Sequence, residues 1–491
     1  MKRHISKSKF LSGLQCSKLL WTAYNAKHLI PSPDDSLEAI FEQGHEVGAL
    51  AKQLFPGGIE IGGNAKDLPE TIRLTQGELG SRRPLFEAAF EFQGGYCRVD
   101  ILNPVKGEAW DLIEVKSTTG VKDVHLEDLA FQAWVLTNAG LKIRRCYLCC
   151  INSDFVRSGE IDPQKYFKLQ DVTADLKPLT GTVEEHLDQM AKIIDQKECP
   201  DIKIGNHCDD PYTCPLHEQC WGFLPPASVF TLYRGGKKGF ALLEQGIEKL
   251  QDIPADFRLT ANQAIQRSAL LANQPHIDQP AIDAFLSQLE FPISYLDFET
   301  IGTAVPLFDQ ASPYQQIPFQ YSLHVMRSPR AKPEHYEFLA EDAVDPRAAF
   351  MRQLVADLPA TGSVVTYNAS FEKSRLEECC AIMPEFMRWL KKLKPRIVDL
   401  LIPFRGFRYY HPLQNGTASM KAVLPALTGK GYGDLEIQEG GSASREFLRV
   451  TFGQVPAKER SQVRKNLLAY CCQDTEGMVS IVEALQQLGK P

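Results

Sequence analysis

The segment Tyr295–Thr300 places two carboxylates inside a stretch that is otherwise apolar and aromatic. Such a run predicts a buried β-strand. Asp297 and Glu299 are two residues apart, so they point to the same face of that strand. Two buried carboxylates are costly unless something pairs them, and hard divalent cations such as Mg²⁺ or Mn²⁺ are their usual partners. The alternative is an exposed edge strand with two solvated acids.

Size and composition indicate a globular protein with more than one domain. The 491 residues suffice for two or three domains, and 44% hydrophobic with 9% aromatic residues suits packed cores. The sequence contains no apolar run of the roughly 18 residues that a membrane span needs. The N-terminus, Met1–Lys7, is basic but no continuous apolar segment follows it. We therefore expect no secretion signal, no membrane partner and a cytoplasmic location.

Further acids follow Asp297 and Glu299 along the chain. Ser363–Tyr367 predicts a short strand, and Glu372 lies in the helical stretch that follows it. Val463–Leu488 predicts a helix, in which Tyr470 and Asp474 are four residues apart and share one face.

These motifs, in this order, resemble the DEDDy family of 3′–5′ exonucleases, which have an RNase H-like fold. The resemblance implies that Asp297, Glu299, Glu372 and Asp474 hold two metal ions and that Tyr470 orients the attacking water. Glu372 departs from the family, which usually has Asp at this position. Asp399 is either an auxiliary acid or, as we favour, an acid at the start of a helix.

A second group of polar residues occurs in the first half of the chain. Tyr96–Leu102 and Leu112–Ser117 predict two strands joined by a turn with Gly107. Glu114 and Lys116 share one face of the second strand. Asp100 lies on the first strand, and His45, Glu87 and Gln132 lie on neighbouring elements. His45 and Gln132 are either functional or surface residues of helices, and Glu87 is either structural or a further metal-site acid.

Three cysteines form a regular pattern after this region. Cys208, Cys214 and Cys220 are six residues apart, in a segment where prolines predict a loop. A tetrahedral or cubane site needs a fourth thiolate, for which Cys16 is the best candidate and Cys199, just before Pro200, a weaker one. Zinc is the general alternative to an iron–sulfur cluster. The adjacent pairs are interpreted as buried free thiols: Cys149–Cys150, Cys379–Cys380 and Cys471–Cys472.

The order of these motifs over residues 5–225 resembles RecB-like nucleases of the PD-(D/E)xK superfamily that carry an iron–sulfur cluster. The resemblance implies a 4Fe-4S cluster on Cys16, Cys208, Cys214 and Cys220, and a catalytic Mg²⁺ or Mn²⁺ on His45, Asp100 and Glu114. It also implies that Lys116 orients water and that Gln132 is the glutamine found downstream of this lysine. The family often has Tyr four residues after the glutamine, where this chain has Leu136.

The whole chain resembles bacterial proteins in which these two nuclease domains are fused, the second belonging to a domain-of-unknown-function group. We therefore expect an α/β protein. Residues 1–225 would form a restriction-endonuclease-like domain, 226–290 a helical connector, and 291–491 an RNase H-like domain.

The net charge of −7 does not by itself suggest a nucleic-acid partner. Positive charge is instead local, in the run Arg388–Arg396 and in Phe404–His411, where arginines alternate with aromatic residues. The second pattern predicts phosphate contact with base stacking, and the first predicts either phosphate contact or a solvated helix face.

The expected function is that of a metal-dependent nuclease with two active sites, acting on DNA ends. One alternative is an RNA 3′–5′ exonuclease, because the sequence contains no clear reader of the 2′-hydroxyl. The other is a nucleic-acid-binding protein in which one nuclease domain is inactive, as the departures at Glu372 and Leu136 would allow.

Overall fold

The chain divides into two compact α/β units in a computed structural model that describes residues 4–62 and 67–488. The first unit comprises Met1–Phe223 with Thr303–Tyr314, and the second comprises Leu224–Gly302 with Gln315–Pro491. Residues 226–290, expected as a separate connector, lie within the second unit. Met1, Lys2 and Arg3 of the basic N-terminus lie outside the described residues.

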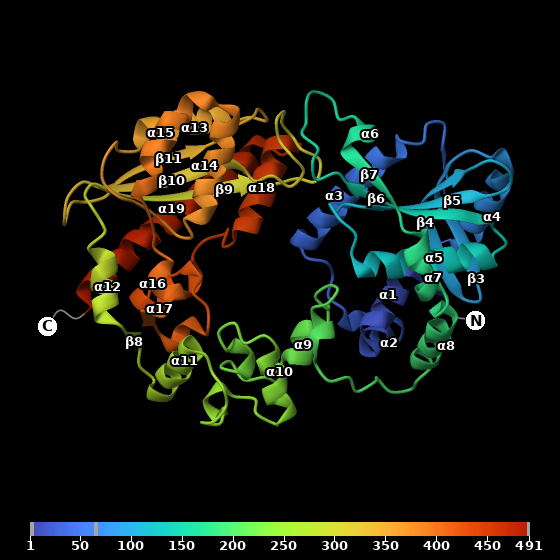
Figure 1. The fold of residues 1–491 in the computed structure, drawn as a ribbon, viewed down its shortest axis with the longest axis horizontal. Helices are drawn as coiled ribbons and strands as arrows, with labels where there is room; N and C mark the ends of the chain where they lie inside the picture. Colours follow the sequence, from blue (N-terminus) through green and yellow to red (C-terminus); the bar gives the residue numbers. More distant parts are fainter. Residues whose placement is uncertain (1–3, 63–66, 489–491) are drawn as a thin grey trace. The chain divides into compact units, whose positions relative to one another are not determined.

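A mixed sheet forms the centre of the first unit (Figure 1). Its strand order is β2-β3-β4-β5-β6-β7, with β1 pairing with β4. The two strands predicted around Gly107 are confirmed as β4 and β5, which pair antiparallel with Ile101 opposite Ile113. The bounds are β1 (Ile5–Ser6), β2 (Ile59–Glu60), β3 (Leu85–Phe92), β4 (Gly95–Pro104), β5 (Trp110–Lys116), β6 (Ile143–Ile151) and β7 (Phe167–Asp171).

Helices cover both faces of this sheet. On one face α5 is buried along most of its length and packs with α1 and with Leu102 and Leu112. On the other face, Val47 and Ala51 of α3 pack with Ile101 and Ile113. The bounds are α1 (Lys7–Gln15), α2 (Ser17–Asn25), α3 (Asp35–Lys52), α4 (Leu68–Glu78), α5 (Asp123–Asn138), α6 (Pro163–Tyr166), α7 (Thr173–Thr180), α8 (Val183–Ile194) and α9 (His217–Trp221).

Thr303–Tyr314, although distant in sequence, is part of the first unit. The hydroxyl of Tyr166 donates to the carbonyl of Ala304 at 2.9 Å, and Arg157 donates to the carbonyls of Pro306 and Leu307. Because these contacts use backbone carbonyls, the side-chain pattern of the segment gave no sign of them.

The second unit is built on a sheet in the order β11-β10-β9-β12-β13. The central strand β9 pairs antiparallel with β10 and parallel with β12. The predicted strand around Asp297 and Glu299 is therefore confirmed as a buried strand with neighbours on both sides. The bounds are β9 (Ile293–Ile301), β10 (Ile317–Met326), β11 (Glu334–Leu339), β12 (Val364–Thr366) and β13 (Ile397–Asp399), with β8 (His276–Ile277) and β14 (Tyr409–Tyr410) pairing separately.

Figure 1 shows helices on both sides of this sheet, with α13 and α15 on one side and α19 on the other. Leu296 and Phe298 of β9 pack with α13 and α14, whereas α18 and α19 contact the same strand from the opposite side. The bounds are α10 (Lys237–Glu244), α11 (Ala261–Ala272), α12 (Gln279–Leu286), α13 (Arg347–Asp357), α14 (Ser370–Ile382), α15 (Met387–Leu393), α16 (Ile402–Arg405), α17 (Met420–Thr428), α18 (Gly440–Phe452) and α19 (Ala457–Gln487).

None of the helices in the described parts of the chain is both long enough and apolar enough for a membrane span.

Candidate functional sites

Three predicted metal ligands meet in the second unit. Asp297 and Glu299 of β9 and Asp474 of α19 each have a carboxylate oxygen within 4.8 Å of the other two. The first two converge because they are two residues apart on one strand, and α19 packs against the same strand. Glu299 and Asp474 are buried and Asp297 is half-buried. This arrangement is suited to a divalent cation, since oxygen ligands and low exposure favour hard ions.

Glu372 lies next to this set but outside it. It occupies the first turn of α14, where its Oε2 is buried and has no hydrogen-bond partner. Burial, together with the charge of Asp399, raises the pKa of Glu372 to about 8. An orphaned buried carboxylate oxygen is costly, and a cation is one group that satisfies it.

Asp399 has a structural environment. It ends β13, and its carboxylate accepts hydrogen bonds from the backbone N–H groups of Asn368 and Leu401, both at 3.0 Å. Leu401 is the residue that precedes α16. Asp399 therefore fixes the turn before a short helix, close to the helix-start position that we favoured.

Burial is the largest influence on the pKa values of the acid set, and repulsion between the carboxylates adds to it for Asp297 and Glu299. Burial raises the pKa of Asp297 well above its usual range, and the charges of Asp474, Glu299 and Glu372 raise it further. Burial also raises the pKa of Glu299 and of Asp474, and the positive charge of Lys421 partly offsets both increases. The site holds more negative charge than its own residues neutralise, which is the property that a cation-binding site requires.

Tyr470 lies at the edge of the acid set. It is buried on α19, four residues before Asp474. A Cβ atom added to Gly440, the first residue of α18, would lie 3.6 Å from Oε2 of Glu299 and 4.0 Å from the hydroxyl of Tyr470. The phenol and this carboxylate thus flank one point at the start of α18, where an added side-chain carbon would be in ordinary contact with both.

Two residues near this site were missed from the sequence. The hydroxyl of Tyr432 donates a hydrogen bond of 2.6 Å to Oδ1 of Asp474. The ammonium group of Lys421 lies 5.9 Å from the ring centre of Tyr432 and 5.7 Å from that of Tyr470. Tyr432 lies in an irregular segment and Lys421 at the start of α17, so no periodic pattern pointed to either.

The acid set predicts an unusual pH dependence. In EDTA, the free energy of unfolding should fall as the pH rises from about 5 to about 8. Burial raises the pKa of Glu299 from 4.5 to about 8 and that of Asp474 from 3.8 to about 6. Their contribution to stability is complete below the unfolded values and is lost as the pH rises through the folded values. Urea unfolding across this range measures the slope.

Glu299→Gln is the matched control for this experiment, because it removes one titrating group and keeps the shape of the side chain. We expect a flatter dependence of the unfolding free energy on pH in this variant. If the unfolding free energy of the two proteins fell equally with pH, Glu299 would not be a group whose pKa is raised in the folded protein.

In the first unit, the structure brings Asp100, Glu114 and Lys116 together. The backbone N–H of Val115 donates to Oδ2 of Asp100 at 2.8 Å, and the ammonium group of Lys116 lies 2.8 Å from Oε1 of Glu114. Burial and the charge of Glu114 raise the pKa of Asp100 to about 7. Burial disfavours the ionised form of Glu114. The positive charges of Lys116 and Lys7 have the larger combined effect and hold the pKa of Glu114 below its usual range.

Gln132 belongs to this network and does not face solvent. Its Nε2 donates to Oε2 of Glu114 at 2.7 Å and to Oδ1 of Asp128 at 2.9 Å, and its side chain is fully buried. Asp128 was missed, although it lies one helical turn before Gln132 on the same face of α5. Lys7 was also missed; its ammonium group lies 2.7 Å from Oε1 of Glu114. A lone lysine near the N-terminus gave no signal.

His45 and Glu87 do not join this network. His45 is exposed on α3, and its ring nitrogens do not form, with Asp100 and Glu114, a set of described atoms within 4.8 Å of one another. Glu87 forms ion pairs with Lys52 at 3.6 Å and Arg98 at 3.5 Å, which favours the structural alternative. Leu136, where the family often has Tyr, is buried in the core of the first unit.

The four predicted cysteine ligands gather at one place. Cys16 lies between α1 and α2, and a small pocket is lined by all four cysteines together with Ile202, Ile204 and Leu216. Nε2 of Gln15 donates to the carbonyls of His207 at 2.8 Å and of Tyr212 at 2.7 Å, which ties α1 to the cysteine loop. Cys199 is exposed and does not line the pocket.

The spacing of the sulfur atoms bears on the kind of group they could hold. Among the described residues, no three of these four sulfurs lie within 4.8 Å of one another. Tetrahedral zinc brings thiolate sulfurs to about 3.8 Å from one another. The present spacing of these sulfurs is therefore wider than a single tetrahedral zinc ion requires.

The aromatic residues of Phe404–His411 do not form a stacking surface. Phe404, Phe407, Tyr409 and Tyr410 are at most 3% exposed, and the rings of Phe407 and Tyr410 stack on each other at 4.4 Å. The prediction that these rings stack on bases is therefore wrong. The alternation arises because the rings enter the core while the intervening arginines, Arg405 and Arg408, face solvent.

Comparison with known proteins finds similarity without a described activity. Residues 294–419 match a family described as "Domain of unknown function (DUF2779)". "Uncharacterized protein MG366" of Mycoplasma genitalium is 28% identical over 214 residues, which cover 40% of this chain and 32% of that protein. "Uncharacterized protein UU173" of Ureaplasma parvum is 25% identical over 238 residues, which cover 44% of this chain and 34% of that protein.

The chain thus spans about a third of the length of these curated relatives. The family match includes Asp297, Glu299 and Glu372, and it ends before Tyr470 and Asp474. The chain is therefore similar to this family in the strands β9–β13, which carry two of the three converging acids.

Proposed function

We propose that the protein is a metal-dependent nuclease that hydrolyses phosphodiester bonds of DNA, preferably at single-stranded ends, and that it has two active sites. The observation that carries this proposal is the convergence of Asp297, Glu299 and Asp474, with carboxylate oxygens within 4.8 Å of one another. A buried set of acids without sufficient counter-charge is suited to Mg²⁺ or Mn²⁺.

In the second unit, the acids would hold cations that activate water and stabilise the leaving oxygen. Tyr470 would align the attacking water, since its hydroxyl and the carboxylate of Glu299 flank the same point. Lys421 provides a positive charge beside the acids for a phosphate oxygen. The position of the acid-bearing strand at the centre of a mixed sheet supports an RNase H-like fold.

In the first unit, Asp100 and Glu114 would be the metal ligands of a PD-(D/E)xK site, and Gln132 would orient Glu114. Both Lys7 and Lys116 neutralise Glu114 in this structure. A cation that binds Glu114 therefore has to displace one ammonium group. Lys7 is the candidate for displacement, which leaves Lys116 to orient water.

The cysteine pocket supports the proposal of a 4Fe-4S cluster on Cys16, Cys208, Cys214 and Cys220. The sulfur spacing is wide for zinc, and the pocket has an apolar side formed by Ile202, Ile204 and Leu216 beside the polar residues Lys18, Lys203, His207 and His217. Such a cluster would join α1 and α2 to the chain that leaves the first unit, and so would have a structural role.

The proposal is tested on end-labelled single-stranded DNA with Mg²⁺, with Mn²⁺ and with EDTA. We expect digestion that requires the metal. Lys116→Ala should remove the activity of the first unit and Asp297→Ala that of the second, so labels at the 5′ or 3′ end reveal the polarity of each. The matched controls are Lys106→Ala and Asp256→Ala, which make the same changes at exposed residues.

Wild-type activity in the double variant would overturn the proposal. Matched RNA oligonucleotides separate a DNA nuclease from an RNA exonuclease. Tight binding of an oligonucleotide that stays intact after long incubation with metal would replace the proposal with that of a binding protein.

A further inference from the structure

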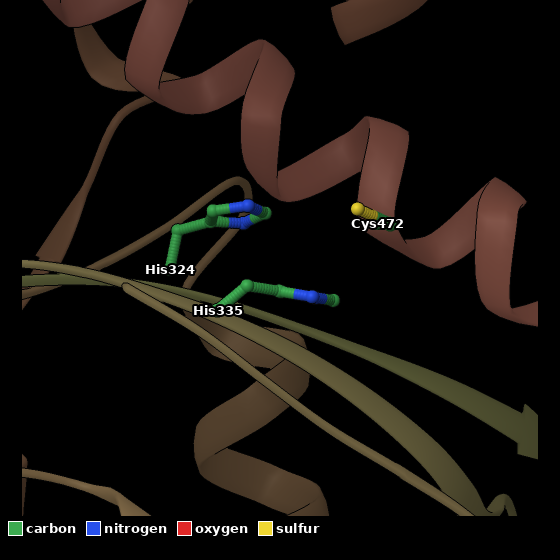
Figure 2. Close-up of side chains that lie close together, drawn as sticks. All are labelled: His324, His335 and Cys472. Atoms are coloured by element: carbon green, nitrogen blue, oxygen red, sulfur yellow. The ribbon is translucent and has the colours of Figure 1, made fainter. Parts of the chain in front are cut away.

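Two histidines and a cysteine come together where α19 packs against β10 and β11. His324 of β10 and His335 of β11 are cross-strand partners, and their rings stack with centroids 4.4 Å apart. Figure 2 shows the two rings one above the other, with the sulfur of Cys472 on the neighbouring helix facing them. One nitrogen of each ring and the sulfur lie within 4.8 Å of one another.

Hydroxyl groups hold one nitrogen of each ring. The hydroxyl of Thr475 lies 2.8 Å from Nδ1 of His324 and 2.6 Å from the hydroxyl of Ser322, and it also lies 3.0 Å from the carbonyl of Cys472. The hydroxyl of Ser322 in turn lies 3.0 Å from Nε2 of His335.

Each imidazole keeps its other nitrogen, Nε2 in His324 and Nδ1 in His335, outside these hydrogen bonds. In metal sites of proteins, a ligating histidine donates its other N–H to an outer partner in just this way. The hydroxyls of Thr475 and Ser322 would be those partners.

We propose that His324, His335 and Cys472 form a binding site for Zn²⁺. Two imidazole nitrogens and one thiolate are ligands that zinc prefers over Mg²⁺ and Mn²⁺. Tetrahedral zinc places such atoms about 3.3–3.6 Å apart, a modest contraction from the present arrangement. The fourth position is open to water or to Glu476, whose Oε1 lies 3.9 Å from Nε2 of His324.

The placement of the site implies what bound zinc would do. It would join β11, the edge strand of the sheet, to α19. The same helix carries Tyr470 and Asp474, which are directed to the acid set on β9. Zinc at this site would thus fix the helix that completes the acid set. The site itself does not depend on the proposed nuclease activity.

The test measures the alkylation of Cys472 by iodoacetamide, with peptide mass spectrometry to locate the label in the metal-free, reduced full-length protein. Cys472 is partly exposed, whereas its neighbour Cys471 is fully buried, so fragment ions distinguish the two. We expect Zn²⁺, added in excess over the four-cysteine pocket and the acid set, to suppress labelling of Cys472 and Mg²⁺ to leave it unchanged. The excess keeps this site supplied with zinc, and the readout is specific to one residue.

His335→Ala should abolish the protection of Cys472 by zinc, whereas His28→Ala, at an exposed histidine of the first unit, should retain it. His335 is exposed on an edge strand, so the variant should fold. Thr475→Val should weaken zinc binding about 10- to 100-fold, because the outer hydrogen bond to His324 is lost. The proposal is overturned if Zn²⁺ leaves the labelling of Cys472 unchanged, or if protection persists in His335→Ala.

Discussion

Asp297→Asn is expected to change activity and stability in opposite directions. Loss of a ligand carboxylate should lower metal-dependent digestion by more than the roughly 10- to 100-fold that loss of an outer partner costs. In EDTA, however, the variant should be more stable than the wild type by about 1–2 kcal/mol, a usual gain where a functional site is relieved of strain. The physical reason is that burial and three neighbouring carboxylates raise the pKa of Asp297, and an amide carries no charge to repel.

Metal addition supplies a second readout for this prediction. At about one hundred times its dissociation constant, Mn²⁺ should stabilise the wild type by about 2.7 kcal/mol. The variant should show little of this gain. Asp256→Asn, at an exposed residue of the same unit, is the control and should leave activity and stability unchanged. Lower stability of Asp297→Asn in EDTA would show that Asp297 serves the fold rather than a cation.

The acid set was predictable from sequence because each of its members follows a local period. Asp297 and Glu299 obey the two-residue repeat of a strand, and Tyr470 and Asp474 obey the four-residue repeat of a helix. Tyr432 and Lys421 follow neither rule, since tertiary packing alone brings their segments to the site. Local periodicity therefore identified the ligands of the site but not the groups that surround them.

In the first unit, sequence reasoning found the strands and missed the charge balance. Glu114 and Lys116 were expected to have separate roles, Glu114 as a metal ligand and Lys116 as the residue that orients water. The structure instead pairs them directly and adds Lys7 from a distant segment. A pairing across more than one hundred residues leaves no trace in spacing. The same limit applies to the alternating arginines and aromatics near Phe407, where spacing indicated amphipathic character but not which side faced solvent.

The two candidate sites differ in the source of their counter-charge, and this difference has a consequence. Lysines neutralise Glu114 in the first unit, whereas the acids of the second unit mostly face one another. The first site is therefore complete without a metal, and the second is strained without one. We infer that removal of Mg²⁺ or Mn²⁺ should destabilise the second unit more than the first.

Cys208→Ser is expected to have the largest effect on stability. If a cluster joins Cys16 to Cys208, it closes a loop of roughly two hundred residues, and a cross-link of that span contributes about 5 kcal/mol in the chain-entropy account. Its loss should lower the melting temperature by about 10–20 °C for a unit of this size. Anaerobically purified wild-type protein should be brown and contain iron, and the variant should be colourless.

Cys199→Ser is the matched control, because Cys199 is exposed, lies outside the cysteine pocket and has its thiol 3.8 Å from the carbonyl of Pro200. It should keep the colour, the iron and the melting temperature of the wild type. A colourless wild type with one zinc ion per cysteine pocket would replace the cluster with zinc, and the sulfurs would then have to move closer together than they are in this structure. Equal melting temperatures of Cys208→Ser and the wild type would show instead that packing and the hydrogen bonds of Gln15 hold the loop without any bound group.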